Sequence, residues 1–393
     1  MKTFHRVTAV SVVLGSIVLV FLGLTYVSTK TEGPLARALT VAGVVLGEME
    51  NSVVKFFRGP GREAELAWLQ PYRSSISALR TPDTLLLGAF DNNIPQTLDG
   101  ILQLEEAIGA RMPLVHFYAA WGDKPEQQFP SKLVRAIWNL GSLAVITWEP
   151  WLTDFENVNH PHLPLRDVRD RGGAADIARG VYDFYLDQWA ADAAAFGKPV
   201  FVRLAHEMND PYRYPWGPQN NSIPDFLAAW RHIITRFKAV GAKNVVWVWS
   251  PHVAYEYYPY YPGDEYVDWV ATQVLNYGTV APWSRWWTAE EIFGNHYQYL
   301  AALNKPVMVA EFSSLAVGGD RSAWFRDALR DFPLRFPAVK ALLFFHHSND
   351  ATITYQHLDW SFARDSTVSI VVKETIRKWG QRTIQNEKLK MKN

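Results

Sequence analysis

Short apolar segments rich in β-branched and aromatic residues alternate with longer helix-like segments from Thr84 onward. Strands that are apolar throughout and alternate with helices indicate a parallel sheet covered by helices. Eight such units predict a closed (β/α)8 barrel, the TIM barrel. The predicted strands are Leu85–Phe90, Pro113–Phe117, Leu143–Thr147, Val200–Leu204, Val245–Trp249, Trp269–Val274, Val307–Ala310 and Ala341–Phe345. The predicted helices are Thr97–Ile108, Ala174–Ala195, Pro224–Val240, Ala289–Leu303 and Arg321–Arg330.

An open, doubly wound sheet is the main alternative arrangement. No Gly-x-Gly-x-x-Gly follows an early predicted strand, so a dinucleotide-binding fold lacks its main signal. In a barrel of this type, the reacting groups are expected directly after the strand C-termini. The polar and aromatic residues at those positions are Asp91, Trp121, Glu149, His206, Glu207, His252, Asn276, Tyr277, Glu311, His346 and His347. The sequence therefore predicts one site at one end of the barrel.

Aromatic residues make up 14% of the chain, and many lie in loop-like segments such as Tyr212–Gly217. Most aromatic residues in a protein belong to the core, but those exposed in loops favour a ligand with flat apolar faces, such as a sugar. The net charge of zero argues against nucleic acid as a partner. The chain has no cysteine, which excludes disulfides, thiol catalysis and thiolate metal sites.

Two glutamates stand at the ends of predicted strands that lie apart around the barrel. Glu207 follows the fourth strand and Glu311 ends the seventh. Glycoside hydrolysis needs two carboxyl groups that flank the scissile bond, one to protonate the leaving oxygen and one to attack or to activate water. A buried ion pair with an arginine is the alternative role for each glutamate, and Arg203, inside the fourth strand, needs such a partner.

Several motifs occur in the order and spacing of one known family. They are His206-Glu207-Met208-Asn209, Tyr214-Pro215-Trp216-Gly217, Val245-Val246-Trp247-Val248-Trp249-Ser250-Pro251, Tyr261-Pro262-Gly263-Asp264 and Ala310-Glu311-Phe312. Over roughly residues 84–365 the chain resembles glycoside hydrolase family 26. The resemblance implies a retaining endo-acting enzyme for β-mannan, mixed-linkage β-glucan or β-xylan, with Glu207 as acid/base and Glu311 as nucleophile.

The resemblance also implies supporting roles. His206 would position the reacting groups, Tyr277 would hydrogen-bond the nucleophile, and Trp216 would line the sugar cleft. Arg203, which lies inside the fourth strand, and Asn209, which belongs to the first of the matching motifs, are predicted to support the pair. The predicted substrate-binding residues, besides Trp216, are Trp121, Glu149, Trp249, His252 and His346.

The sequence departs from the family pattern at the rim of the site. Asp210-Pro211-Tyr212-Arg213 stands where the family usually has Gly followed by an aromatic residue, and His252 replaces the more familiar Asn. At the eighth strand, His346 and His347 stand where a Trp is often expected, and adjacent residues on a strand point to opposite faces. We therefore predict no metal and no cofactor, and the substrate stays open.

The N-terminus predicts a membrane anchor. Lys2 and Arg6 precede Val7–Val27, an uncharged and mostly apolar segment of about twenty residues, long enough to span a bilayer. A cleaved signal peptide is the alternative, but no small-x-small site follows. The positive flank predicts a single pass through the cytoplasmic (inner) membrane, with the rest on the periplasmic or extracellular side. The expected division is 1–28 anchor, 29–75 helical stalk, 76–381 barrel and 382–393 charged tail.

The predicted function is that of a membrane-anchored retaining endo-β-glycanase with a β-linked polysaccharide as its substrate, and an exopolysaccharide is one candidate. The machinery for polysaccharide synthesis or export is then a candidate partner. The alternative is a catalytically silent glycan-binding or assembly subunit of an export system.

Overall fold

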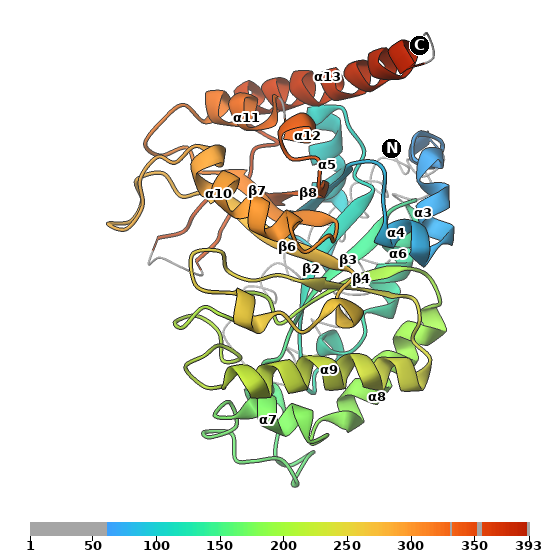
Figure 1. The fold of residues 1–393 in the computed structure, drawn as a ribbon, viewed down its shortest axis with the longest axis vertical. Coiled ribbons are helices and arrows are strands. Elements are labelled where there is room, and N and C mark those ends of the chain that lie inside the picture. The colour runs from blue at the N-terminus through green and yellow to red at the C-terminus, as the bar shows by residue number, and fades with distance from the viewer. Residues whose placement is uncertain (1–60, 331, 352–355, 391–393) are drawn as a thin grey trace, which may run out of the picture. The chain divides into compact units, whose positions relative to one another are not determined.

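Eight parallel strands close into one barrel in the order of the sequence (Figure 1). The structure, a computed structural model, describes residues 61–330, 332–351 and 356–390. The predicted (β/α)8 barrel is confirmed, and every predicted strand is present. The strands are β1 (Leu86–Asp91), β2 (Leu114–Ala120), β3 (Leu143–Glu149), β4 (Val200–Leu204), β5 (Val245–Trp249), β6 (Trp269–Asn276), β7 (Val307–Ser314) and β8 (Val339–His346).

Helices surround the barrel, as Figure 1 shows. The α-helices are α3 (Gln70–Ser74), α4 (Ile76–Arg80), α5 (Asp99–Ile108), α6 (Ser131–Asn139), α7 (Gly173–Ala178), α8 (Asp183–Phe196), α9 (Ile223–Val240), α10 (Ala289–Ala301), α11 (Arg321–Leu329), α12 (Phe332–Arg335) and α13 (Ser366–Lys390). Short 3₁₀ helices are η1 (Ala67–Leu69), η2 (Pro125–Gln127), η3 (Leu152–Asp154), η4 (Tyr258–Tyr260) and η5 (Asp264–Tyr266).

The single helix predicted over Ala174–Ala195 is wrong, because the chain breaks there into α7 and α8. Gly180 lies between them with φ of 85°, a left-handed conformation that interrupts a right-handed helix. The sequence prediction also missed α6 and α13. The helix α13 continues to Lys390, through most of the segment expected to be a charged tail.

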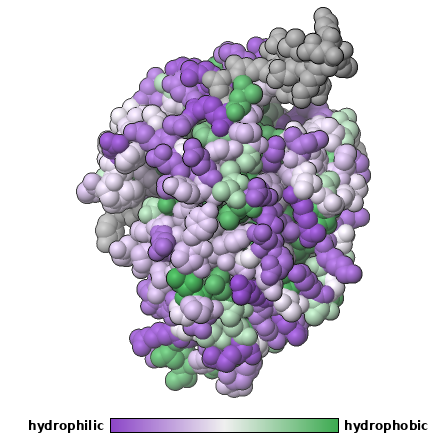
Figure 2. All heavy atoms as spheres, in the orientation of Figure 1, coloured by the Kyte–Doolittle hydropathy of each residue, from purple (hydrophilic) through white to green (hydrophobic). Residues whose placement is uncertain are grey.

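Local sequence signals set the ends of the longest helix between strands. The side chain of Ser222 caps α9 by accepting a hydrogen bond from the backbone N–H of Asp225, and Pro224 lies in the first turn. Gly241, with φ of 93°, ends the helix. The apolar face of α9 is buried and includes Phe226, Trp230 and Phe237, while the outer surface is largely hydrophilic (Figure 2).

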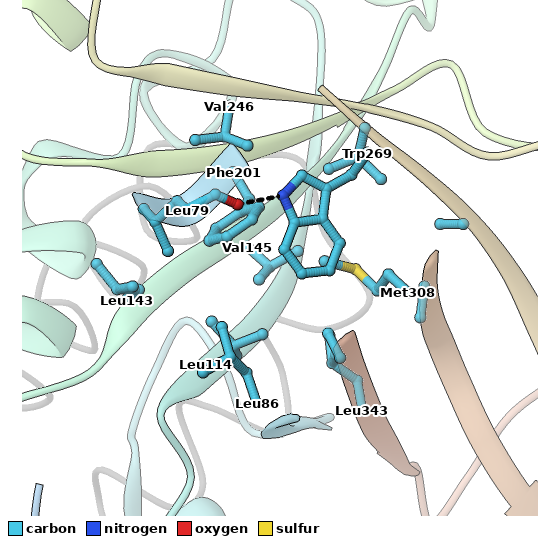
Figure 3. Close-up of a cluster of buried hydrophobic side chains, with 14 of the residues drawn as sticks. Leu79, Leu86, Leu114, Leu143, Val145, Phe201, Val246, Trp269, Met308 and Leu343 are labelled. Carbon is cyan, nitrogen blue, oxygen red and sulfur yellow. Dashed lines mark hydrogen bonds between the residues drawn. The ribbon is translucent and has the colours of Figure 1, made fainter. Parts of the chain in front are cut away.

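Inward-pointing side chains fill the N-terminal half of the barrel, and the segment before β1 packs against them. Leu69, Tyr72 and Leu79 join one buried cluster with residues of the eight strands. The indole Nε1 of Trp269 donates a 2.7 Å hydrogen bond to the carbonyl of Leu79 (Figure 3). Leu69 and Tyr72 fall within the segment expected to be a stalk, yet they pack in the core of the barrel.

The predicted transmembrane helix Val7–Val27 and most of the predicted stalk lie outside the described residues. Within residues 61–330, 332–351 and 356–390, no helix is both long enough and apolar enough to cross a bilayer.

A buried arginine ties the start of the described chain to the barrel. Arg62 pairs with Glu105 of α5 at 2.6 Å, and both side chains are almost completely buried. The same guanidinium donates to the carbonyl of Met112 at 3.0 Å and to Ser142 Oγ at 2.8 Å. It also donates to the carbonyl of Leu140. Its charge and donors are therefore compensated within the protein, as burial of an ion requires.

Replacing Arg62 by Met should destabilise the protein, because Glu105 would be left as a buried charge without its main partner. We expect the free energy of unfolding to fall by about 3–5 kcal/mol. Urea denaturation followed by tryptophan fluorescence measures the change. Arg166→Met is the control, because Arg166 and Glu156 are exposed and 3.8 Å apart, and it should change stability by about 1 kcal/mol at most. Equal effects of the two substitutions would contradict this account.

Candidate active site

A strained turn at the end of β4 presents Glu207. Ala205 and Glu207 both have positive φ, 41° and 53°, which is uncommon outside glycine. Backbone hydrogen bonds hold this turn: the N–H of Ala205 donates to Trp148 at 2.9 Å, and the N–H of Glu207 donates to Ser250 at 2.7 Å. Such strain persists only where the surrounding structure enforces it, and it is concentrated at functional positions.

A bulge in β7 turns Glu311 into the barrel. In the pairing of β6 with β7, Thr272 lies opposite Val309 and Gln273 lies opposite Glu311, so Ala310 has no partner. The extra residue shifts the alternation of side chains by one. Ala310 points into the barrel with the core cluster. Because of the bulge, the next residue, Glu311, points inward as well. Strict alternation would have turned Glu311 out toward the helices.

Two donors bind the same oxygen of Glu311. The guanidinium Nη1 of Arg203 lies 2.6 Å from Oε1, and the hydroxyl of Tyr118 donates to that oxygen at 2.9 Å. Arg203 is itself buried and also donates from Nε to Ser250 Oγ at 2.9 Å. Among the described residues, neither Arg203 nor Tyr118 uses Oε2 of Glu311. Both contacts hold Oε1 of Glu311 in place and leave Oε2 without either of these donors.

Glu207 is buried in a different environment. One carboxyl oxygen, Oε2, lies 3.0 Å from Nη1 of Arg213, while the other, Oε1, is buried without a hydrogen-bond partner in the described part of the chain. Burial raises the pKa of Glu207, and the charge of Glu311 adds to that effect. Arg213 and His252 oppose it. The net upward shift of the pKa favours the protonated form, which a general acid requires.

Glu149, at the end of β3, is a third buried carboxyl group. Burial raises its pKa from 4.5 to about 7, although Trp151 donates to its Oε2 at 3.0 Å. His206 lies beside it, with Nδ1 3.8 Å from Glu149 Oε1. Burial, with the charges of Arg203 and Arg213, holds the pKa of His206 well below its usual range. His206 is therefore a neutral imidazole, and its Nε2 lies 3.0 Å from the hydroxyl of Tyr214.

Asn209 joins the two loops that carry the acid side of the site. Its Oδ1 accepts from the N–H of His252 at 2.8 Å, and its Nδ2 donates to the carbonyl of His252 at 2.8 Å. The paired bonds fix the loop after β5 against the turn after β4. The supporting role predicted for Asn209 stays a prediction, and its partner His252 lies near Glu207.

One group of possible metal ligands occurs at this edge of the barrel. Oxygen atoms of Glu207 and Asp210 and a nitrogen of His252 lie within 4.8 Å of one another. The guanidinium of Arg213 already provides a positive charge to Glu207. A cation held there would face that charge, so this arrangement suits an ion pair better than a metal, and the prediction of no metal stays a prediction.

The structure corrects the roles predicted for two tryptophans. Trp249 is fully buried on the outer side of the barrel wall, and its Nε1 donates to the carbonyl of Tyr260 at 3.1 Å. Val246 and Val248 point inward, so alternation along β5 turns Trp249 outward. Trp121 is also fully buried, with its ring 4.7 Å from that of Trp148. Neither ring can reach a sugar in the barrel mouth without rearrangement.

Three further predicted contacts differ as well. Trp216 is buried, stacks on Tyr214 at 4.6 Å and donates from Nε1 to the carbonyl of His206 at 2.8 Å, so it supports the site from behind. His346 points out of the barrel and bonds Asp91 Oδ2 at 2.8 Å, because Phe345 takes the inward position. Tyr277 packs edge-on against Trp360, and the phenol that reaches Glu311 belongs to Tyr118.

Sequence reasoning missed two residues of the site. Tyr118 was outside the predicted second strand, which ended at Phe117, whereas β2 continues to Ala120. Its alternation with Leu114 and His116 was the available signal that it faces inward. Arg213 was noticed only as a departure in the rim, and its contact with Glu207 depends on how the loop folds.

The fold and site define a (β/α)8 barrel with Glu149, Glu207 and Glu311 at the C-terminal ends of its strands. Residues 181–327 match the family model described as "Glycosyl hydrolase family 26". "Endoglucanase H" from Acetivibrio thermocellus is 31% identical over 276 residues, 68% of this chain and 28% of the relative. "Beta-1,3-xylanase TXYA" from a Vibrio species is 28% identical over 152 residues, 37% of this chain and 30% of that relative.

Solved structures agree at the level of the fold. A family 26 β-mannanase from Bacteroides ovatus has a TM-score of 0.53 at 18% identity, over 78% of this chain and 92% of that one. A modular endo-β-1,4-mannanase from Cellulomonas fimi has a TM-score of 0.51 at 15% identity, over 78% of this chain and 73% of that one. These matches confirm the predicted resemblance to glycosyl hydrolase family 26. It spans less than a third of the length of either curated relative.

The raised pKa of Glu149 predicts a pH-dependent stability. The folded protein binds this proton more tightly than the unfolded chain, so the stabilisation is complete below pH 4.5 and is lost as pH rises through about 7. At ~1.4 kcal/mol per pKa unit, the loss is about 3 kcal/mol. Glu149→Gln should remove this component, so urea denaturation at pH 4 and pH 8 should show a smaller fall than wild type.

Glu156→Gln is the control, because the side chain of Glu156 is 55% exposed. It should keep the pH dependence of wild type. If Glu149→Gln and wild type lose the same stability between the two pH values, Glu149 does not hold the proton.

Proposed function

We propose that this protein is a membrane-anchored retaining endo-β-glycanase, with Glu207 as acid/base and Glu311 as nucleophile. The observation that carries the proposal is that two buried carboxyl groups, Glu207 and Glu311, have different surroundings. Glu311 forms an ion pair with Arg203 through one oxygen, while burial raises the pKa of Glu207. Double displacement needs one carboxyl group that can give a proton and a second one that is positioned to attack, and these two environments fit those roles.

In the first step, Oε2 of Glu311 attacks the anomeric carbon while Glu207 gives its proton to the glycosidic oxygen. The bond between that oxygen and the anomeric carbon breaks, and an ester between Glu311 and the sugar forms. Arg203 and Tyr118 hold Oε1 of Glu311 and aim the carboxylate. The part of the glycan that carries the glycosidic oxygen leaves, with the proton of Glu207 on its new hydroxyl.

In the second step, Glu207 acts as a base. Esterification removes the negative charge of Glu311, so the carboxylate of Glu207 is no longer opposed by it, and the pKa of Glu207 falls. Glu207 takes a proton from water, and the water oxygen attacks the anomeric carbon. The ester breaks, Glu311 regains its charge, and the sugar keeps its original configuration.

A β-linked polysaccharide fits this site and the family. The related proteins are named as an endoglucanase, a β-1,3-xylanase and β-mannanases. Among the described residues, the rim holds exposed aromatic side chains, including Tyr212 and Trp283. Such rings offer flat faces for sugar contacts. β-Mannan, mixed-linkage β-glucan and an exopolysaccharide are all candidate substrates, and export or synthesis machinery is a candidate partner.

The chemistry is tested by offering wild type and Glu311→Ala β-mannan, mixed-linkage β-glucan, β-xylan and bacterial exopolysaccharides. Wild type should release oligosaccharides from at least one of them, and loss of the nucleophile should lower kcat by about 10³-fold or more. Glu156→Ala is the matched control and should behave as wild type. Binding without cleavage by wild type would instead support a catalytically silent glycan-binding subunit.

The stereochemistry is tested with Glu207→Ala and an aryl β-glycoside of the accepted sugar. The good leaving group needs no proton, so the ester should form and wait for a base. Added azide should speed its breakdown and give the β-glycosyl azide, identified by NMR. An α-configured product would contradict the assignment of Glu311 as nucleophile.

The anchor is tested by fractionation of cells that express the full chain or a variant lacking residues 1–28. The full chain should stay in the membrane pellet after carbonate washing, because Val7–Val27 is long enough to span the bilayer. The shortened variant should be soluble. Release of the full chain by carbonate would contradict the anchor.

A further inference from the structure

Arg213 is the residue of the site that the double-displacement scheme does not use. Its Nη1 lies 3.0 Å from Oε2 of Glu207, and its guanidinium lies over the ring of Tyr214 at 5.0 Å. Glu207 is the one carboxylate with which it pairs in the described part of the chain. The side chain is 26% exposed, so it reaches the open side of the site.

The pair between Arg213 and Glu207 opposes the reaction. A guanidinium beside a carboxyl group favours the carboxylate, yet Glu207 must carry a proton to release the leaving sugar. When Glu207 is protonated, Arg213 keeps its charge and loses its counterion. A partly buried cation without a counterion is costly, so a substrate that supplies one would relieve the conflict.

Each departure from the family pattern at this edge introduces a basic group, and the first also introduces the buried Asp210, which lies near Glu207 and His252. Arg213 stands in the changed segment after Asn209, and His252 replaces the usual Asn after β5. Both lie beside Glu207, where their charges oppose the rise of its pKa. Because Glu207 protonates the leaving oxygen, this basic edge faces the part of the glycan that leaves.

We propose that the glycan carries an anionic substituent, such as the carboxylate of an acidic sugar, on the leaving-group side of the cleaved bond, and that Arg213 binds it. The proposal rests on the proposed function, because it takes Glu207 as the acid. On binding, Arg213 exchanges Glu207 for the substrate's anion through charge-assisted hydrogen bonds. Oε2 of Glu207 is then free of the cation and holds the proton. Arg213 is thus the residue that selects an acidic glycan.

The test compares carboxymethyl and hydroxyethyl derivatives of the same backbone, matched in degree of substitution, for both β-1,4-glucan and β-1,4-mannan. The two derivatives differ in charge and share the sugar chain. Wild type should prefer the carboxymethyl form by roughly 10-fold or more in kcat/KM, the size expected for a charge-assisted contact. In Arg213→Gln the preference should disappear, and Arg213→Lys should keep part of it. Arg326→Gln, an exposed arginine on α11, is the control and should keep the full preference.

A second readout does not depend on turnover. Binding of the same polymers is measured by calorimetry with Glu311→Ala, and with Glu311→Ala combined with Arg213→Gln. The single variant should bind the carboxymethyl form more tightly, and the double variant should bind both forms alike. If no polymer is cleaved but this difference in binding is present, the proposed catalysis fails and the acidic-glycan site stands. If wild type shows no preference in either readout, or if Arg213→Gln weakens both forms equally, Arg213 is only a partner of Glu207 and the proposal is overturned.

Discussion

The ion pair between Arg203 and Glu311 is the interaction on which the site depends. It joins β4 to β7 through the interior of the barrel at 2.6 Å, and both groups are almost completely buried. Two buried charges are costly unless they are paired and their remaining donors are satisfied. Ser250 and Tyr118 complete the arrangement by accepting from Arg203 and donating to Glu311. The pair therefore fixes the position of the Glu311 carboxyl group at the mouth of the barrel.

Glu149 and Glu207, the other two glutamates of the site, lie near the cations Arg203 and Arg213. Glu149 and Glu207 both have raised pKa values because burial penalises their charged forms. The half-buried Arg213 is the cation bonded to Glu207 and comes from a loop, whereas Arg203 comes from a strand and is fully enclosed. Arg203 bonds to Glu311, Ser250 and Thr147 and is poorly placed to move. Arg213, which comes from a loop and forms one ion pair among the described residues, is better placed to change its partner when a ligand binds.

The sequence predicted the barrel well because each strand is a continuous apolar segment, and it placed Glu207 and Glu311 at strand ends. The side of the wall that each residue faces was harder to predict. Trp249 and His346 lie on the outer side of the wall because side chains alternate along a strand. Counting that alternation along each predicted strand would have shown this. Glu311 faces inward only because of the bulge at Ala310, and no residue type in that segment marks a bulge. Arg213 depends on loop folding, for which no periodicity exists.

Chemistry and specificity are carried by different parts of this molecule. Arg203, Tyr118 and Glu311 come from strands whose register the closed barrel fixes, so their geometry is insensitive to changes at the rim. Arg213 and His252 come from loops, joined to the strands through contacts such as those of Asn209. Loops can change sequence without disturbing the packed strands. The charge of the rim can therefore change while Arg203, Tyr118 and Glu311 keep their geometry. Under the proposed function, the loops that carry Arg213 and His252, rather than the strands, would then select the glycan.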